Sequence, residues 1–181
     1  MNKKKTEKII TIAGIATIVA VLIIICYLSV VVKKGQIIKS VNYGTITMTY
    51  VDQNIAAISP MKPMDDQEAL ESANYFAFQL TSKSKTKQYI YFEPLKDNTL
   101  DKKYVKVALT SYDGEKETIV GYPKMVEDFN EYAPEYGYLI YNGELDSKVE
   151  YRFRVWIDSI ADSKEVANTK YGVKVKAYGA A

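Results

Sequence analysis

The sequence predicts an all-β fold: a two-sheet antiparallel sandwich of jelly-roll type, with an immunoglobulin-like sandwich as the alternative, preceded by one N-terminal transmembrane helix. Apolar and polar residues alternate along most segments after residue 43, which is the pattern of half-buried strands. No alternating helical segments separate them, so parallel βαβ units are not expected. Sixteen residues are Tyr, which can pack its ring in a half-buried strand and keep its hydroxyl in water.

The N-terminal part divides into a tail, a membrane span and a linker. Residues 1–8 carry four lysines against one acid, and residues 9–32 contain no charge. A helix of that length rises about 36 Å, which exceeds the ~30 Å hydrocarbon core of a bilayer. Residues 33–43 then form a linker to a domain spanning residues 44–181. We expect a single-pass protein of the cell membrane, with its N-terminus in the cytoplasm and its C-terminal domain extracellular.

Several features favour a helix that remains attached as a signal-anchor. The apolar run is longer than that of a signal peptide and ends at Lys33 without small residues at a cleavage position. Ile25, rather than a small residue, precedes Cys26, which argues against a lipoprotein signal. The numbers of lysines on the two sides of the span are nearly equal, so the positive-inside rule does not decide the orientation. The expected orientation rests on the size of the C-terminal part. A cleaved signal and an acylated Cys26 stay open as alternatives.

Eight strands and two short helices are expected in the domain. The clearest strand, Val149 to Ile157, has its odd-numbered apolar residues on one face and Glu150, Arg152, Arg154 and Trp156 on the other. The dipeptide Asp113-Gly114 predicts a tight hairpin turn. The expected strands are, in order, residues 45–50, 73–80, 88–92, 104–109, 117–120, 136–141, 149–157 and 171–177, and the expected helices are residues 63–71 and 158–166.

Composition excludes most enzymatic chemistry. The chain has no His and one Cys, so His-dependent triads, His-based zinc sites and an internal disulfide are excluded. Its 9 glycines never form a phosphate-binding loop. We therefore expect a protein that is not an enzyme and has no cofactor. Four lysines and one acid lie in the tail, which leaves 20 basic and 21 acidic residues. This near-neutral balance does not favour nucleic acid as a partner.

A few residues qualify as candidate sites. Asp65, Asp66 and Glu68 offer carboxylates that Ca²⁺ could use, although helix capping explains them more simply. Trp156 lies on the polar face of its strand, where it is a partner contact, a sugar platform or, as we favour, a ring packed under a loop. Arg152 and Arg154 are expected to pair with acids on neighbouring strands. The pairs Tyr89/Tyr91 and Tyr136/Tyr138 favour cross-strand packing over a binding platform.

The order of segments resembles the camelysin/TasA-like group of Gram-positive surface and biofilm-matrix proteins. The resemblance rests on the export helix, on Gly44 to Met48, on Tyr75 to Leu80, on "YRFRVWID" at Tyr151 to Asp158, and on "YGVKVKA" at Tyr171 to Ala177. It implies a small jelly-roll domain with a matrix or surface role, and strand exchange between subunits. Some relatives have been classed as metallopeptidases, and the absence of His argues against carrying that activity over.

The sequence therefore predicts a membrane-anchored extracellular structural or interaction protein that acts by non-covalent contacts. Its partner would be another protein or further copies of itself. An edge strand can pair with a partner strand, and we expect the first strand, with Thr45, Ile46, Thr47 and Met48, to be the donor. The alternatives are a carbohydrate- or ligand-binding surface module and an accessory subunit of a membrane or secretion complex.

Overall fold

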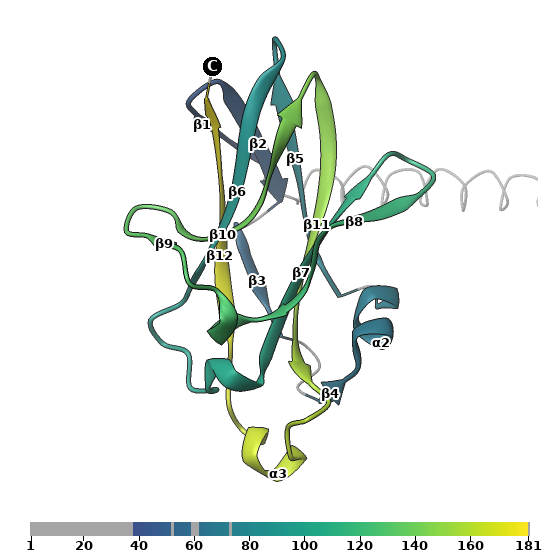
Figure 1. Ribbon diagram of the computed structural model, residues 1–181, viewed down its shortest axis with the longest axis vertical. Coiled ribbons are helices and arrows are strands. Elements are labelled where there is room, and N and C mark those ends of the chain that lie inside the picture. Colours follow the sequence, from purple (N-terminus) through teal and green to yellow (C-terminus); the bar gives the residue numbers. More distant parts are fainter. Residues whose placement is uncertain (1–37, 52, 59–61, 73, 181) are drawn as a thin grey trace, which may run out of the picture. The chain divides into compact units, whose positions relative to one another are not determined.

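A computed structural model of the chain describes residues 38–51, 53–58, 62–72 and 74–180. Residues 38–181 form one compact unit, shown in Figure 1. The predicted tail, membrane span and residues 33–37 of the linker lie outside the described residues. Among the residues that are described, no helix has the length and apolar character needed to cross a membrane.

The domain is an all-β sandwich of two sheets, as predicted, and the larger sheet is called sheet A (Figure 1). Neighbouring strands along it are antiparallel, while the short strand β4 (Pro63–Met64) pairs in parallel with the end of β11. The order of its other strands is β1 (Ile38–Tyr43), β2 (Ile46–Val51), β5 (Phe76–Ser82), β11 (Lys148–Asp158), β7 (Val105–Tyr112) and β8 (Glu117–Met125).

The smaller sheet, called sheet B, is antiparallel throughout. Its strand order is β3 (Ile55–Ala57), β12 (Gly172–Ala180), β6 (Thr86–Pro94), β10 (Gly137–Leu145) and β9 (Tyr132–Ala133). The connections carry four short helical turns: α2 (Asp66–Glu71), η1 (Lys102–Tyr104), η2 (Val126–Asp128) and α3 (Ser163–Val166).

The core lies between the inward faces of the two sheets. Phe92 of sheet B and Phe153 of sheet A are both fully buried, and their ring centroids lie 5.8 Å apart across the interface. Each side chain of this kind contributes about 1.5–3 kcal/mol by leaving water. The residues of β11 that the alternation placed inward, such as Tyr151, Phe153 and Ile157, are buried in the core.

A second apolar cluster lies on the outer face of sheet A, beneath α2. Asp65 begins this helix, because its side chain accepts a hydrogen bond from the backbone N–H of Glu68 at 2.8 Å. The helix places Ala69 over Trp156, which is 2% exposed. Because α2 covers this part of β11, Trp156 is buried although it lies on the face of the strand that the alternation predicted to be polar.

Several predicted boundaries change in the structure. Residues 38–43, expected in the linker, form the edge strand β1 and pair with β2. The helix expected at residues 158–166 is confined to α3, because Asp158 still belongs to β11. The hairpin at Asp113-Gly114 is confirmed: Gly114 has a φ of 104°, and the N–H of Asp113 donates to the carbonyl of Lys116.

The turn between β1 and β2 joins the beginning of the domain to its end. Gly44 has a φ of 64° and forms a bridge with Gly179 in β12, and the N–H of Thr45 donates to the carbonyl of Gly179 at 3.1 Å. The Thr45 hydroxyl also lies 2.6 Å from that of Thr86, which donates to the carbonyl of Ala180. This contact ties sheet A to sheet B at one end of the sandwich.

Candidate strand-binding groove

The outermost strands of the two sheets differ in how well they resist pairing with another chain. At the edges of sheet A, β8 contains Pro123 and Lys124 and two irregularities in its register, and β1 contains Lys39. At one edge of sheet B, β9 has only two residues and is followed by Pro134. Prolines, lysines and bulges are the features by which natural edge strands avoid intermolecular pairing. The fourth, β3, has the sequence Ile-Ala-Ala and is also short, but it contains no proline, lysine or bulge.

Among the described residues, the backbone of β3 pairs with another strand, β12, on one side only. The N–H of Ile58 donates to the carbonyl of Tyr171, and the carbonyl of Asn54 accepts from the N–H of Val175. Backbone groups in an antiparallel pair alternate in direction along the strand. Ala56 therefore turns its N–H and carbonyl toward β12, while Ile55 and Ala57 turn theirs away from it.

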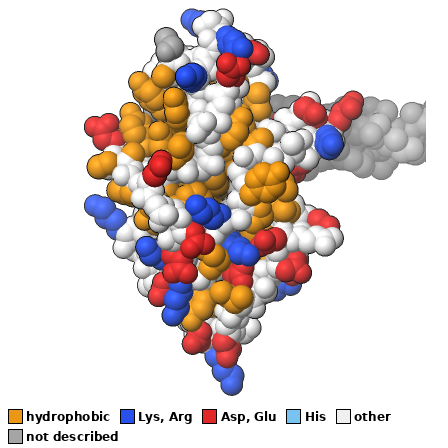
Figure 2. Space-filling model, viewed as in Figure 1, with side chains coloured by type: hydrophobic (Ala, Val, Ile, Leu, Met, Phe, Trp, Pro, Cys, Tyr) orange, Lys and Arg blue, Asp and Glu red, His pale blue; other side chains and the backbone are white. Residues whose placement is uncertain are grey.

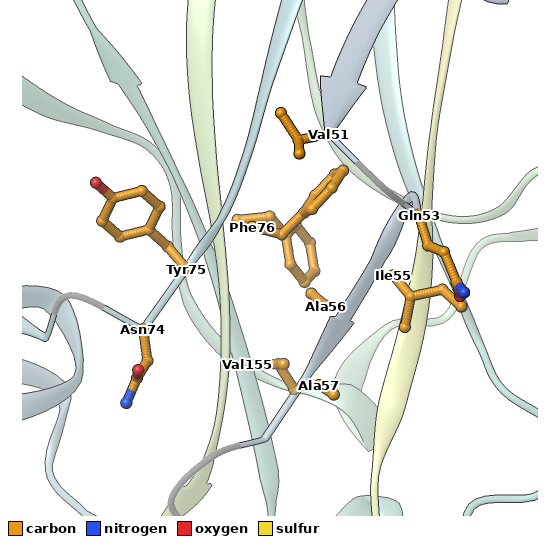
Figure 3. Close-up of a pocket in the computed structure, with 10 residues that line it drawn as sticks. Val51, Gln53, Ile55, Ala56, Ala57, Asn74, Tyr75, Phe76 and Val155 are labelled. Atoms are coloured by element: carbon orange, nitrogen blue, oxygen red, sulfur yellow. The ribbon is translucent and has the colours of Figure 1, made fainter. Parts of the chain in front are cut away.

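An open groove of about 490 Å³ runs beside this edge (Figure 3). The partly buried Phe76 and the buried core residues Phe153 and Val155 are among the residues that line it. None of the described lining residues is charged, and Figure 3 shows Phe76, Ala56 and Val155 between β3 and the segment that carries Tyr75. The lining consists of Val51, Gln53, Ile55, Ala56, Ala57, Asn74, Tyr75, Phe76, Phe153 and Val155.

The floor of the groove is continuous with the rigid core. The ring of Phe76 stacks on Phe78 at a centroid distance of 5.6 Å and lies 6.1 Å from Tyr50. Phe78 in turn stacks on Tyr151. A residue bound against Phe76 would therefore contact a surface that is already formed.

Two arginines contact Tyr75, a lining residue of the groove, and do not line the groove themselves. The Tyr75 ring, 37% exposed, receives the guanidinium groups of Arg152 and Arg154 at 4.7 and 5.0 Å from its centroid. Both arginines pair with Glu117 of β8, and Arg152 also pairs with Glu150 of its own strand. Acids on neighbouring strands were expected, but β7 separates β8 from β11, so the long arginine side chains reach across β7. Partial burial alone would raise the pKa of Glu117, but hydrogen bonds from Arg154, Thr110 and Arg152 lower it.

The structure places the predicted donor strand in the interior of sheet A. Strand β2 pairs with β1 on one side and with β5 on the other, so it is not an edge. Ile46 and Met48 are buried in the core, and Thr47 donates to Asn42 of β1. The alternation correctly indicated a strand, but the edge position depended on β1, which the sequence did not predict.

Trp156 and the acidic residues also have structural partners. Trp156 packs beneath α2 and does not present its ring at the surface. Asp65 caps α2, Asp66 lies 2.9 Å from the Lys106 amine, and Glu68 pairs with Lys62. In residues 38–180, apart from the positions not described, no three acidic or thiol side chains converge as metal ligands.

The groove combines outward-facing backbone donors and acceptors with apolar side chains on its floor, and Tyr75 is the one titratable side chain among its described lining residues. No family model, curated protein or solved structure matches the chain. Sequence reasoning missed this site because β3 has only three residues, too few to show a period. The available signal was the uncharged run Asn54 to Ile58.

Proposed function

We propose that this protein is a membrane-anchored, extracellular structural or interaction protein, and that β3 accepts an extended strand from a protein partner. The observation that carries the proposal is the edge strand β3, which contains no charge, proline or bulge and lies beside a groove with apolar side chains on its floor. Strand addition obtains affinity from backbone hydrogen bonds and specificity from the side chains that enter the groove. The structure thus favours this domain as acceptor, in place of the donor role expected for residues 45–50.

The chemistry of the incoming strand follows from the groove. Ile55 and Ala57 together offer two N–H groups and two carbonyls, enough for a short ladder. Alternate side chains of the guest would point toward Phe76 and Val155. Because no charged residue is among the described residues that line the groove, a guest residue with a charge beside them would lose hydration without gaining a partner there. The guest is therefore an uncharged strand with apolar side chains at alternate positions.

The remaining parts of the proposal come from the sequence. The uncharged run at residues 9–32 would hold the domain at the outer surface of the cell membrane. The similarity to camelysin/TasA-like proteins supports a jelly-roll arrangement and a role in the cell surface or matrix. In such a role, the partner strand belongs either to a different protein or to another copy of this chain.

A photo-crosslinking experiment tests the proposal. A benzoylphenylalanine replaces Val51, which is 39% exposed on the groove rim, in the full-length membrane protein. We expect a crosslinked adduct that is lost in A57P, because proline removes an outward N–H, and retained in A57S, which keeps it. The mass of the adduct tells a second copy from another protein.

The control places the same probe at Tyr122, which is 75% exposed on the protected edge β8. An adduct there should not depend on residue 57. If the adduct at Val51 forms equally in A57P and A57S, or does not form at all, strand addition at β3 is refuted.

A further inference from the structure

The outer face of sheet B carries a cluster of tyrosines, on a surface distinct from the β3 groove. Tyr89 and Tyr91 of β6 and Tyr178 of β12 point outward, because the residues between them, such as Ile90 and Ala177, are buried. Tyr178 lies directly opposite Tyr89. Figure 2, in the view of Figure 1, shows hydrophobic side chains gathered in the upper part of the molecule, with charged side chains above and below them.

The rings form one continuous surface. Tyr136, just before β10, lies over two strands at once: its ring centroid is 5.2 Å from that of Tyr91 and 5.6 Å from that of Tyr178. All four tyrosines are half-buried, so each combines an exposed part of its ring with its hydroxyl. Partial burial and the neighbouring phenols raise the pKa of Tyr91. The four residues present flat apolar area with hydrogen-bonding groups.

Lysines flank the tyrosines at both ends. Lys87 and Lys174 are exposed, and neither forms an ion pair with another described residue. Lys87 lies opposite Ala180, six residues along β12 from Lys174. At about 3.4 Å per residue the two lysines are roughly 20 Å apart. A ligand that contacts both, with the tyrosines between, is therefore a polymer.

The wider charge distribution makes this face distinctive. Six lysines and one glutamate of the chain's 24 basic and 22 acidic residues precede residue 38, which leaves 18 basic and 21 acidic residues in the domain. On this face β6, β10 and β12 point Lys87, Lys174 and Lys176 outward, and Lys87 and Lys174 lie opposite Glu144 and Glu93 in the register. Glu144 forms its ion pair with Lys85 and Glu93 with Lys176, so Lys87 and Lys174 are the lysines of this face without an ion pair to a described residue.

We propose that this tyrosine face, consisting of Tyr89, Tyr91, Tyr136 and Tyr178 with Lys87 and Lys174, binds an acidic polysaccharide. The C–H faces of sugar rings pack on exposed phenol rings, and the two lysines pair with carboxylates spaced along the chain. Nucleic acid fits less well, because its phosphates recur every few ångströms and this face offers only two unpaired cations. The proposal does not depend on strand addition at β3.

The test measures binding of the full-length protein, in nonionic detergent, to immobilised polygalacturonate. Uncharged dextran and oligo-dT serve as comparison ligands. We expect clear binding to polygalacturonate, weaker binding to dextran, and about a tenfold loss of affinity in the double variant Y91A/Y136A. The double variant K87A/K174A should bind more weakly and with a smaller dependence on salt. Y122A, which removes a tyrosine from β8, is the matched control and should bind like the unmodified protein.

Trp156 is the only Trp in the chain, so its fluorescence verifies folding of each variant. Should Y91A/Y136A unfold, K87A/K174A carries the test, because both lysines are exposed and contribute nothing to the core. Absence of binding to polygalacturonate, or binding unchanged in both double variants, would overturn the proposal. Binding to oligo-dT that is tighter and is lost in the same variants would also overturn it and identify a nucleic-acid site. A57P should leave polygalacturonate binding intact, which separates this test from that of the groove.

Discussion

Proline substitutions at two adjacent residues of β3 test the assignment on which the groove depends. The hydrogen bonds at Asn54 and Ile58 imply that Ala56 points its N–H toward β12 and that Ala57 points its N–H outward. A56P should therefore break the ladder to Val173, whereas A57P should remove an N–H group that has no partner among the described residues. The two variants differ by one position and insert the same residue.

The structure sets the size of the expected difference. Ala56 is 5% exposed and faces the fully buried Val173. A56P loses one hydrogen bond and leaves a buried carbonyl unpaired, about 1–3 kcal/mol, and its ring adds strain of about 1–3 kcal/mol in a packed interior. We expect a loss of at least about 2 kcal/mol in the free energy of unfolding. A57P should change it by less than about 1 kcal/mol, because proline is tolerated on the outward side of an edge strand.

Urea denaturation followed by the fluorescence of Trp156 measures both values in the full-length protein. The signal reports on the domain alone, since no other Trp is present. A57S is the control for changing the side chain without removing the N–H, and should match the unmodified protein. The reasoning is refuted if A56P and A57P lose the same stability, or if A57P is the more damaging of the two.

Three further predictions concern the stability of the sandwich, each measured by denaturation with a far-UV circular dichroism readout. W156A should lose about 3–5 kcal/mol, the usual range for a buried large aromatic residue, because the ring is 2% exposed beneath α2; a loss below 1 kcal/mol would contradict its burial. Asp158 is 3% exposed, and its carboxylate lies 2.6 Å from the Lys106 amine. Burial alone would raise the pKa of Asp158, but hydrogen bonds from Lys106 and from the N–H of Ile160 lower this pKa below the usual 3.8. Because the folded pKa of Asp158 is depressed, the stability that this carboxylate contributes should be complete above about pH 5 and lost as the pH falls through its folded pKa. D158N should reduce this dependence of the unfolding free energy on pH. An unchanged acid dependence in D158N would count against the pair of Asp158 and Lys106. G44A should destabilise the domain by roughly 2 kcal/mol or more, because a β-carbon there would lie 2.1 Å from the Gly179 carbonyl oxygen at a φ of 64°; wild-type stability in G44A would show that this contact does not form.

Sequence periodicity predicted the long strands well, because their alternation records which face is buried. The clearest example is β11, expected at residues 149–157 and observed at Lys148–Asp158. The strand β1 was missed because Ile-Lys-Ser-Val-Asn-Tyr does not alternate, and it forms through pairing with β2. The alternation of residues in the strand could not predict that α2 covers Trp156, because this helix lies far from Trp156 in the sequence. The sequence favoured a ring packed under a loop.

The candidate site was less predictable than the fold. The groove joins residues 51–57, 74–76 and 153–155, and only the sheet topology shows that these three segments meet. Tyrosines 89 and 91 were recognised as a pair, but the sequence grouped Tyr136 with Tyr138. In the structure Tyr138 packs inward against Phe92, while Tyr136 lies beside Tyr91. Tyr136 precedes the first residue of β10, Gly137, so it does not share a strand face with Tyr138, and the expected pair Tyr136/Tyr138 does not form.

The position of β12 limits when this protein can reach its native state. The last nine-residue strand, Gly172–Ala180, lies between β3 and β6 and also holds the Gly44 turn. Until residues 172–180 have been synthesised, sheet B has a gap in its middle, and hydrogen-bonding groups on β3 and β6 face that gap. Folding of this sheet must therefore wait for β12, and a product that stops before residue 172 would be prone to aggregation.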